Sequence, residues 1–201
     1  MSEFDELVQQ IQACTLCTLS RKRTNAVPGE GSLTADIMFV GEGPGYYEDR
    51  DGRPFVGPAG KLLDRLLSTA GFKRENVYIT NMVKCRPPNN RDPLSGEVRS
   101  CSTYLDKQIT MIGPKVIVAL GRHSFSKFFP GESITKARGK PRAWNGLTIY
   151  PMYHPAAALR NPGLLPSLES DFKELPLLLE QPLPKANNTD EEQSEQLSLF
   201  R

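Results

Sequence analysis

Four short runs of apolar, β-forming residues recur along the chain, at 37–40, 77–80, 116–120 and 148–153. Each run leads into a glycine, an asparagine or a His-Pro pair, where a strand is expected to end. The spacing between the runs leaves room for a helix in each interval. The pattern therefore predicts four strands separated by helical connections.

The intervals between the runs do show apolar residues at helical spacing. The clearest sets are Leu62, Leu63, Leu66 and Leu67, ending at Gly71, and Val98, Cys101, Leu105 and Ile109. A further stripe at the N-terminus contains Phe4, Leu7, Val8 and Ile11, with Ser2 as a candidate N-cap. Alternation of strand and helix is typical of a parallel sheet covered by helices on both faces. We expect an α/β protein, a three-layer α/β/α fold around a central four-stranded parallel sheet.

The length and the C-terminal composition predict one domain with a tail. A chain of 201 residues with 38% hydrophobic residues can bury one substantial core. After Pro184 the sequence becomes polar and acidic, which is typical of disorder. We expect a folded domain at 1–184 and a disordered tail at 185–201. The tail ends abruptly in the apolar residues Leu197, Leu199 and Phe200.

Charge and hydropathy limit the cellular location and the binding partners that we expect for the protein. The N-terminus lacks the apolar stretch of a signal peptide, and no run of eighteen apolar residues occurs, so we expect a cytoplasmic protein without a membrane span. The net charge is +2, but the acidic tail conceals a more basic domain. Basic residues gather at 21–23, at Lys84 and Arg86, and between 136 and 142. Such groups suit a phosphate backbone or a solvated surface.

A glycine-rich loop follows the first predicted strand. Gly41, Gly43 and Gly45 allow a ligand to approach the backbone closely, while Pro44 makes the loop rigid around one acid, Glu42. The dinucleotide fingerprint and the phosphate loop of nucleotide triphosphatases both require residues that are absent here. Because ligands bind at the carboxyl ends of parallel strands, we expect this loop, Asn81, Gly121 and His154 to share one edge of the sheet.

The two histidines differ in their predicted importance. His154 follows the last strand and precedes Pro155, which makes the turn rigid at the sheet edge. His123 lies in a Gly-Arg-His-Ser segment, and we expect it to be structural.

The four cysteines, Cys14, Cys17, Cys85 and Cys101, indicate a metal site rather than disulfides in a reducing compartment. Cys101 lies on the apolar face of its predicted helix and should point inward. Four thiolates suit tetrahedral Zn²⁺ and iron–sulfur clusters alike, so the spacing leaves both open.

Several motifs together resemble the family 4 uracil-DNA glycosylases. They are the loop 41–45, the segment 52–57 (Gly-Arg-Pro-Phe-Val-Gly), the segment 80–88 (Thr-Asn-Met-Val-Lys-Cys-Arg-Pro-Pro) and the turn 154–157 (His-Pro-Ala-Ala). The resemblance extends over about residues 1–175 in unbroken order. It implies a bacterial enzyme of base excision repair that removes flipped-out uracil from single- or double-stranded DNA and leaves an abasic site. It also implies that the four cysteines bind a [4Fe–4S] cluster of structural function.

The resemblance assigns a group of residues to reading the base. Phe55 would stack on the uracil ring, and Asn81 would donate to O4 and accept from N3–H, a pairing that cytosine does not satisfy. Gly41 and Gly43 would let the base approach, and Glu48 would guard against the 5-methyl group of thymine.

A second group would act on the glycosidic bond and on the DNA. His154 would hydrogen-bond uracil O2 as negative charge develops, and Glu42 would position water or stabilise the sugar cation. Leu159 and Arg160 would fill the vacated stack and contact phosphate. Family members that trap DNA covalently carry an extra histidine in a basic loop. The stretch 89–92 lacks that histidine, so we expect turnover by a monomer.

The end of the tail resembles the pentapeptide that docks bacterial proteins on the β sliding clamp, through Gln196, Leu197, Leu199 and Phe200. Two alternatives to the uracil-DNA glycosylase function stay open. One is the same fold acting on hypoxanthine or xanthine, and the other is a non-catalytic iron–sulfur adaptor that binds DNA or the clamp.

Overall fold

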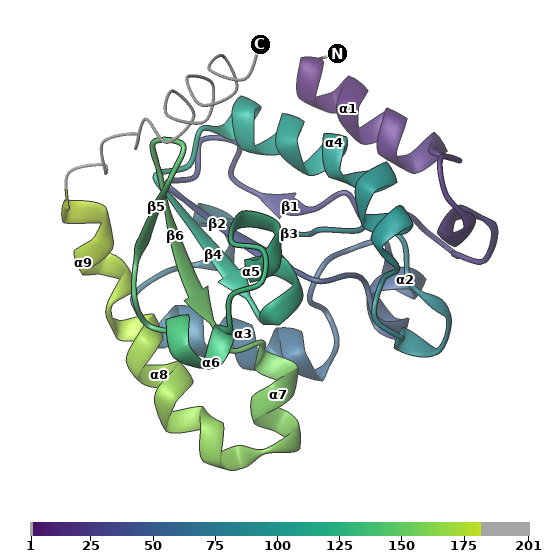
Figure 1. Cartoon of the computed structure of the whole chain (residues 1–201). Coiled ribbons are helices and arrows are strands. Elements are labelled where there is room, and N and C mark those ends of the chain that lie inside the picture. The colour runs from purple at the N-terminus through teal and green to yellow at the C-terminus, as the bar shows by residue number, and fades with distance from the viewer. Residues whose placement is uncertain (1, 182–201) are drawn as a thin grey trace, which may run out of the picture.

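The computed structural model describes residues 2–181, which form a three-layer α/β/α domain (Figure 1). Its strands are β1 (Glu30–Gly31), β2 (Ile37–Gly41), β3 (Tyr78–Asn81), β4 (Val116–Leu120), β5 (Arg142–Trp144) and β6 (Leu147–Met152). Its α-helices are α1 (Glu3–Ala13), α2 (Tyr46–Asp51), α3 (Pro58–Thr69), α4 (Ser95–Ile112), α5 (Arg122–Phe128), α6 (Ile134–Ala137), α7 (Pro155–Arg160), α8 (Leu165–Lys173) and α9 (Leu175–Glu180). Short 3₁₀ turns occupy Thr18–Arg21, Arg74–Asn76, Pro88–Asn90 and Pro162–Leu164.

The sheet has six strands in the order β1-β3-β2-β4-β6-β5. The four central strands are parallel and coincide, within a residue or so at each end, with the four predicted runs. β1 and β5 add antiparallel pairings at the two edges. The prediction of a purely parallel four-stranded sheet is therefore wrong in its strand count, while the α/β/α architecture is confirmed.

The edge strands escaped the hydrophobic pattern because they are short and only partly buried. β1 has two residues, and β5 has three half-buried ones. β5 is joined to β6 by Asn145 and Gly146, with φ of 46° and 76°. An Asn-Gly pair with positive φ at both residues is the favoured connection of a tight hairpin, so the sequence did contain a signal for β5.

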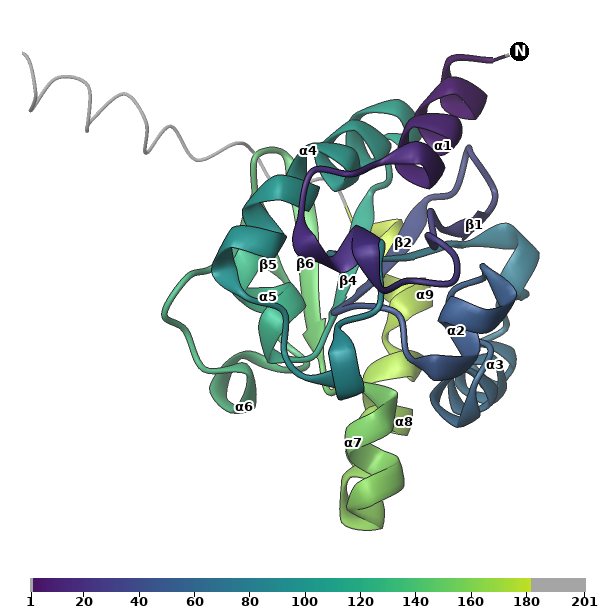
Figure 2. The same ribbon diagram turned by 90° about the vertical axis from the view of Figure 1, so that its right-hand side faces the viewer.

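Alternate residues of the central strands pack against two different helical layers. Ile37 and Phe39 of β2 face the layer made of α3, α7, α8 and α9. Met38 and Val40 face the layer made of α4, α5 and α6. Both layers are visible around the sheet in Figures 1 and 2. β2, β3 and β4 are buried on both faces, so their residues are mostly apolar.

A third apolar cluster lies between α1 and α4 and includes the cysteines. Ser2 caps α1 as predicted, since its hydroxyl accepts from the Asp5 amide at 3.1 Å. Leu7 and Ile11 then pack with Cys85 and Cys101, and Cys14 and Cys17 lie against the same cluster. No helix in the described part of the chain is both long and apolar enough to cross a bilayer.

Several of the clustered basic residues are buried or paired with acidic residues. Lys84 is 1% exposed, so it is not available to a phosphate backbone. Arg138 pairs with Asp171 at 2.6 Å, and Arg142 pairs with Glu132 at 2.6 Å. These ion pairs engage Arg138 and Arg142 within the protein, and the burial of Lys84 fits neither a phosphate contact nor a solvated surface.

Candidate functional site

A cavity of about 590 Å³ opens at the carboxyl edge of the parallel strands. Its lining includes Glu42 after β2, Asn81 at the end of β3, Gly121 after β4 and His154 before α7. These are the four positions that the sequence placed at one sheet edge, and the structure confirms that they meet there.

Asn81 forms the buried floor of this cavity. The residue is 1% exposed, yet its Oδ1 has no hydrogen-bond partner. A Cβ added at Gly41 would lie 2.4 Å from this Oδ1 and 2.7 Å from the Phe55 ring. Only glycine at position 41 allows the amide and the ring to lie this close to the β2 backbone. A buried, unpaired acceptor beside an aromatic ring is a site prepared for a polar, planar ligand.

Phe55 is held in an unusual backbone conformation, with φ of 50°. Arg74 donates to the Phe55 carbonyl at 3.2 Å and also to the Pro54 carbonyl. On its other side the Phe55 carbonyl touches Gly60, where an added Cβ would lie 1.8 Å from the oxygen. These contacts fix a left-handed conformation that a non-glycine residue adopts only when its surroundings impose it.

His154 lies beside Phe55, with ring centroids 5.4 Å apart and an interplanar angle of 26°. It is the N-cap of α7, and its Nδ1 accepts from the Ala156 amide at 3.1 Å. Burial, together with the positive charge of Arg160, lowers the pKa of His154 to about 4. A neutral imidazole whose Nδ1 is an acceptor carries its proton on Nε2, so His154 can donate one hydrogen bond into the cavity.

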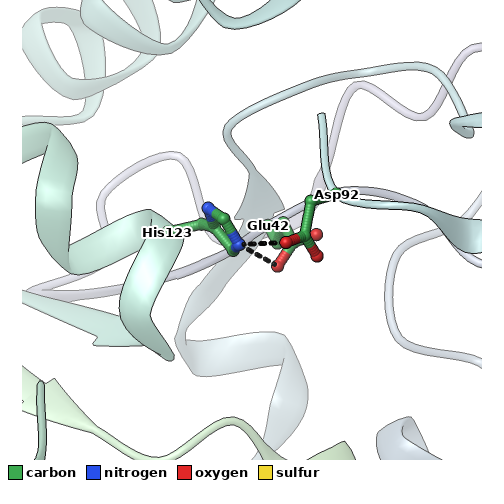
Figure 3. Close-up of side chains that lie close together, drawn as sticks. All are labelled: Glu42, Asp92 and His123. Carbon is green, nitrogen blue, oxygen red and sulfur yellow. Dashed lines mark ion pairs between the residues drawn. The ribbon is translucent and has the colours of Figure 1, made fainter. Parts of the chain in front are cut away.

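Glu42 lines the cavity, and its side chain lies beside those of Asp92 and His123 (Figure 3). The His123 Nε2 is 3.1 Å from Asp92 Oδ2 and 3.7 Å from Glu42 Oε2. Burial raises the pKa of Glu42 above its ordinary value; Asp92 adds to this effect, while His123, Arg122 and Arg160 oppose it. The expectation that His123 is only structural is not supported, because its ring lines the cavity.

The same three residues could in principle bind a cation, since one ligand atom of each lies within 4.8 Å of the others. Arg122, however, donates to Asp92 Oδ2 at 2.5 Å and to His123 Nε2 at 3.0 Å. The guanidinium thus supplies the positive charge that a metal would bring. The cluster is better described as an ion-pair network around Glu42.

Glu48 also reaches the cavity, but its carboxylate is already engaged. Oε1 accepts from the amides of Val56 and Gly57 at 3.0 and 2.9 Å, and Oε2 accepts from Gly45 at 3.1 Å. Glu48 therefore ties the glycine loop to the segment that carries Phe55. Its predicted function as a guard against thymine stays a prediction.

Leu159 and Arg160 lie at the end of α7. Arg160 lines the cavity, whereas Leu159 is 49% exposed and lines a separate hollow between α7 and α3. An apolar side chain this exposed has no role in the core.

The four cysteines converge from three segments on the cluster between α1 and α4. Arg23 donates to Cys85 Sγ at 3.0 Å, and the Lys84 amide donates to Cys101 Sγ at 3.3 Å. Across residues 2–181, three metal-ligating atoms lie within 4.8 Å of one another only in the Glu42, Asp92 and His123 group. No three of the cysteine sulfurs therefore lie within 4.8 Å of one another, whereas four Zn–S bonds of about 2.3 Å would place all four sulfurs roughly 3.8 Å apart.

Lys84 supports the floor of the cavity from behind. Its ammonium donates to the Asn81 carbonyl at 2.8 Å, to Thr80 Oγ1 at 2.6 Å and to Gln108 Oε1 at 2.7 Å. Burial lowers the pKa of Lys84 to about 7. Three hydrogen bonds to one buried amine fix the backbone at the end of β3, and with it the position of the Asn81 amide.

Comparison with known proteins matches residues 28–176 to the model of the uracil DNA glycosylase superfamily. A type-4 uracil-DNA glycosylase of Sulfurisphaera tokodaii is 52% identical over 185 residues, covering 87% of this chain and 84% of the relative. A type-4 uracil-DNA glycosylase of Thermotoga maritima is 52% identical, covering 79% of this chain and 85% of the relative. One of Archaeoglobus fulgidus is 46% identical, covering 87% of this chain and 92% of the relative. With this extent of similarity over a single domain, the chain belongs to the type-4 uracil-DNA glycosylases.

Proposed function

We propose that the protein is a monofunctional uracil-DNA glycosylase, which hydrolyses the bond between a flipped-out uracil and its deoxyribose. The observation that carries the proposal is the buried Oδ1 of Asn81, which has no partner within the protein. Leaving such an acceptor unpaired costs about 1–3 kcal/mol, and a base with a matching donor recovers that free energy on binding.

The Asn81 amide matches the edge of uracil and not that of cytosine. Its Oδ1 accepts from uracil N3–H, and its Nδ2 donates to O4. Cytosine presents an acceptor at N3 and a donor at N4, so both contacts would become repulsive. Phe55 supplies the aromatic surface on which an extruded base stacks, next to the Asn81 amide.

Cleavage leaves negative charge on the departing base, and His154 is suited to stabilise it. With Nδ1 accepting from Ala156, the neutral ring presents Nε2–H toward uracil O2. A preorganised donor of this kind acts where charge develops in the transition state and needs no reorganisation.

Glu42 serves the other half of the reaction, the sugar cation and the attacking water. A carboxylate in the cavity mouth attracts the cationic sugar and accepts a proton from water as it attacks C1′. Arg122 and Arg160 favour the ionised form of Glu42 and oppose the effect of burial, and His123 Nε2 lies 3.7 Å from its carboxylate. This network assigns His123 and Asp92 to positioning Glu42.

The four cysteines Cys14, Cys17, Cys85 and Cys101 fit a [4Fe–4S] cluster, since they converge from three segments and three of their sulfurs accept N–H donors. When bound, the cluster would hold α1 and α4 against the segment that follows Asn81. Hydrolysis needs no electron transfer, so its contribution is structural. Purified protein should contain about four iron atoms per chain and absorb visible light. Colourless, active protein with one zinc would contradict this assignment.

Leu159 and Arg160 are assigned to the DNA, as an apolar side chain that enters the vacated stack and a cation that contacts phosphate. The 89–92 segment contributes Asp92 to the Glu42 network and contains no histidine, so we expect turnover rather than covalent trapping. The proposed clamp-binding residues Gln196 to Phe200 and the predicted tail lie outside the described residues. Deleting 196–201 should abolish clamp binding and leave activity on short oligonucleotides intact.

The test is a panel of oligonucleotides that each contain one uracil, cytosine, hypoxanthine or xanthine. Free base should be released from the uracil strand only. Release from the purine substrates at a comparable rate would favour the broader specificity for deaminated bases. Binding without release from any strand would favour the adaptor.

A further inference from the structure

Two tyrosines at the start of α2 are exposed to solvent, and neither takes part in the proposed cleavage reaction. Tyr46 is 55% exposed and Tyr47 is 44% exposed. Their rings meet edge to face, with centroids 5.5 Å apart. Exposed neighbouring aromatic side chains have an energetic cost in water, which makes them candidates for contact with a partner.

The tyrosines lie at the rim of the cavity. The residues on either side of the pair, Gly45 and Glu48, both line it. The Arg86 guanidinium lies over the Tyr46 ring, 5.2 Å from its centroid, and donates to Asn90 Oδ1 at 2.7 Å. Asn90 is itself part of the lining. Because Glu48 of α2 and Arg160 of α7 both line the cavity, the two helices border the same opening. Their ribbons lie apart in Figure 2.

α2, the short helix that carries the tyrosines, is held in place by several hydrogen bonds. Asp49 is 5% exposed and accepts from the Thr24 amide at 2.9 Å. Asn25 donates to the Asp49 carbonyl at 2.9 Å, and Gly52 ends the helix with φ of 69°. The rings are therefore presented by a fixed support and not by a loose loop.

The chemistry of this surface fits an unpaired nucleotide. An exposed aromatic ring stacks on any base, and an adjacent arginine adds attraction for base and phosphate. Among the described residues, Arg86 has no acidic partner, so its charge is available. In duplex DNA the neighbours of a flipped base stay stacked and paired, so the rings have no free base face to meet.

We propose that Tyr46, Tyr47 and Arg86 form a stacking shelf for an unpaired base beside the extruded uridine, which gives the enzyme an additional binding site on single-stranded DNA. This inference rests on the proposed function. It adds to that function a preference for single-stranded over duplex DNA.

The experiment compares wild type with the double variant Tyr46→Ala, Tyr47→Ala on a single-stranded uracil oligonucleotide and on its duplex. Removing the rings should raise KM for the single strand on the order of tenfold, with kcat and the duplex KM nearly unchanged. The matched control is Tyr46→Phe, Tyr47→Phe, which keeps the stacking faces and should behave as wild type. Leu33→Ala, an exposed apolar residue before β2, controls for loss of exposed apolar surface elsewhere.

A second substrate locates the contact. When the bases flanking uracil are replaced by abasic sites, wild type should lose its advantage over the alanine variant, because the phosphates stay and the stacking partners are gone. Equal KM changes for single strand and duplex, or no change for either, would overturn the shelf.

Fluorescence anisotropy with a uracil-free single strand keeps this test separate from catalysis. Weaker binding by the alanine variant would support the shelf even if no uracil were released, whereas unchanged binding would refute it whatever the activity.

Discussion

Gly41→Ala is the substitution that tests the packing of the pocket floor most sharply. The new Cβ would lie 2.4 Å from Asn81 Oδ1 and 2.7 Å from the Phe55 ring. Ordinary contacts of such atoms are near 3.4 Å or longer, so the amide or the ring must move by about 1 Å. Asn81 is 1% exposed and its carbonyl is held by Lys84, which limits the room for that movement.

A displacement of about 1 Å in a positioned group costs roughly 100-fold in rate. We therefore expect kcat/KM for uracil release to fall about 100-fold, while overpacking lowers the stability of the fold by about 1–3 kcal/mol. The assay is uracil release from a single-uracil oligonucleotide, with thermal unfolding measured in parallel.

The control is Gly96→Ala, on the exposed first turn of α4, where an added Cβ meets nothing within 4 Å. This variant should keep full activity and gain a few tenths to about 1 kcal/mol in stability, since alanine favours the helix. If folded Gly41→Ala retained activity within about threefold of wild type, the proposed contact between Asn81, Phe55 and the β2 backbone would be refuted.

Two further predictions concern charge. If Glu42 acts as a carboxylate, its raised pKa puts the acid limb of the kcat/KM profile above pH 4.5. Asp92→Asn removes a negative neighbour and should move that limb to lower pH, whereas His123→Asn should move it to higher pH; shifts in the same direction would contradict the network. Glu97, buried and paired with Arg91, has its pKa lowered to about 2. It should therefore add stability above pH 4.5 that is lost as the pH falls toward 2. Glu97→Gln should lower the free energy of unfolding, measured in urea at pH 7, by about 2 kcal/mol, a value reduced because Arg91 is partly exposed. The loss should become progressively smaller below pH 4.5. A loss that did not depend on pH would argue against the ion pair.

The sequence predicted the centre of the fold because its strands are buried on both faces and ended by glycine, asparagine or His-Pro. Such runs are recognisable without knowledge of tertiary structure, and strand order then brings Asn81 and His154 to one edge. β5 was missed because only three half-buried residues form it, and its register depends on pairing with β6.

The site was predicted less completely, for a physical reason. Asp92 and His123 are 31 positions apart, and only the folded chain brings them to Glu42. Lys84 shows the opposite failure. A lysine among basic residues indicates a surface position, but the hydrogen bonds that Lys84 donates to Asn81, Thr80 and Gln108 make its burial possible.

The assignment of Asn81 to reading uracil is tested most directly by a single-turnover measurement of free uracil released from a uracil-containing oligonucleotide by wild type and by Asn81→Ala. Wild type should release uracil and leave an abasic strand. The folded variant should release it at a rate at least about 100-fold lower, since both amide contacts to the base are lost. No release by wild type, or equal rates for the two proteins, would contradict the claim that the unpaired Asn81 amide reads uracil.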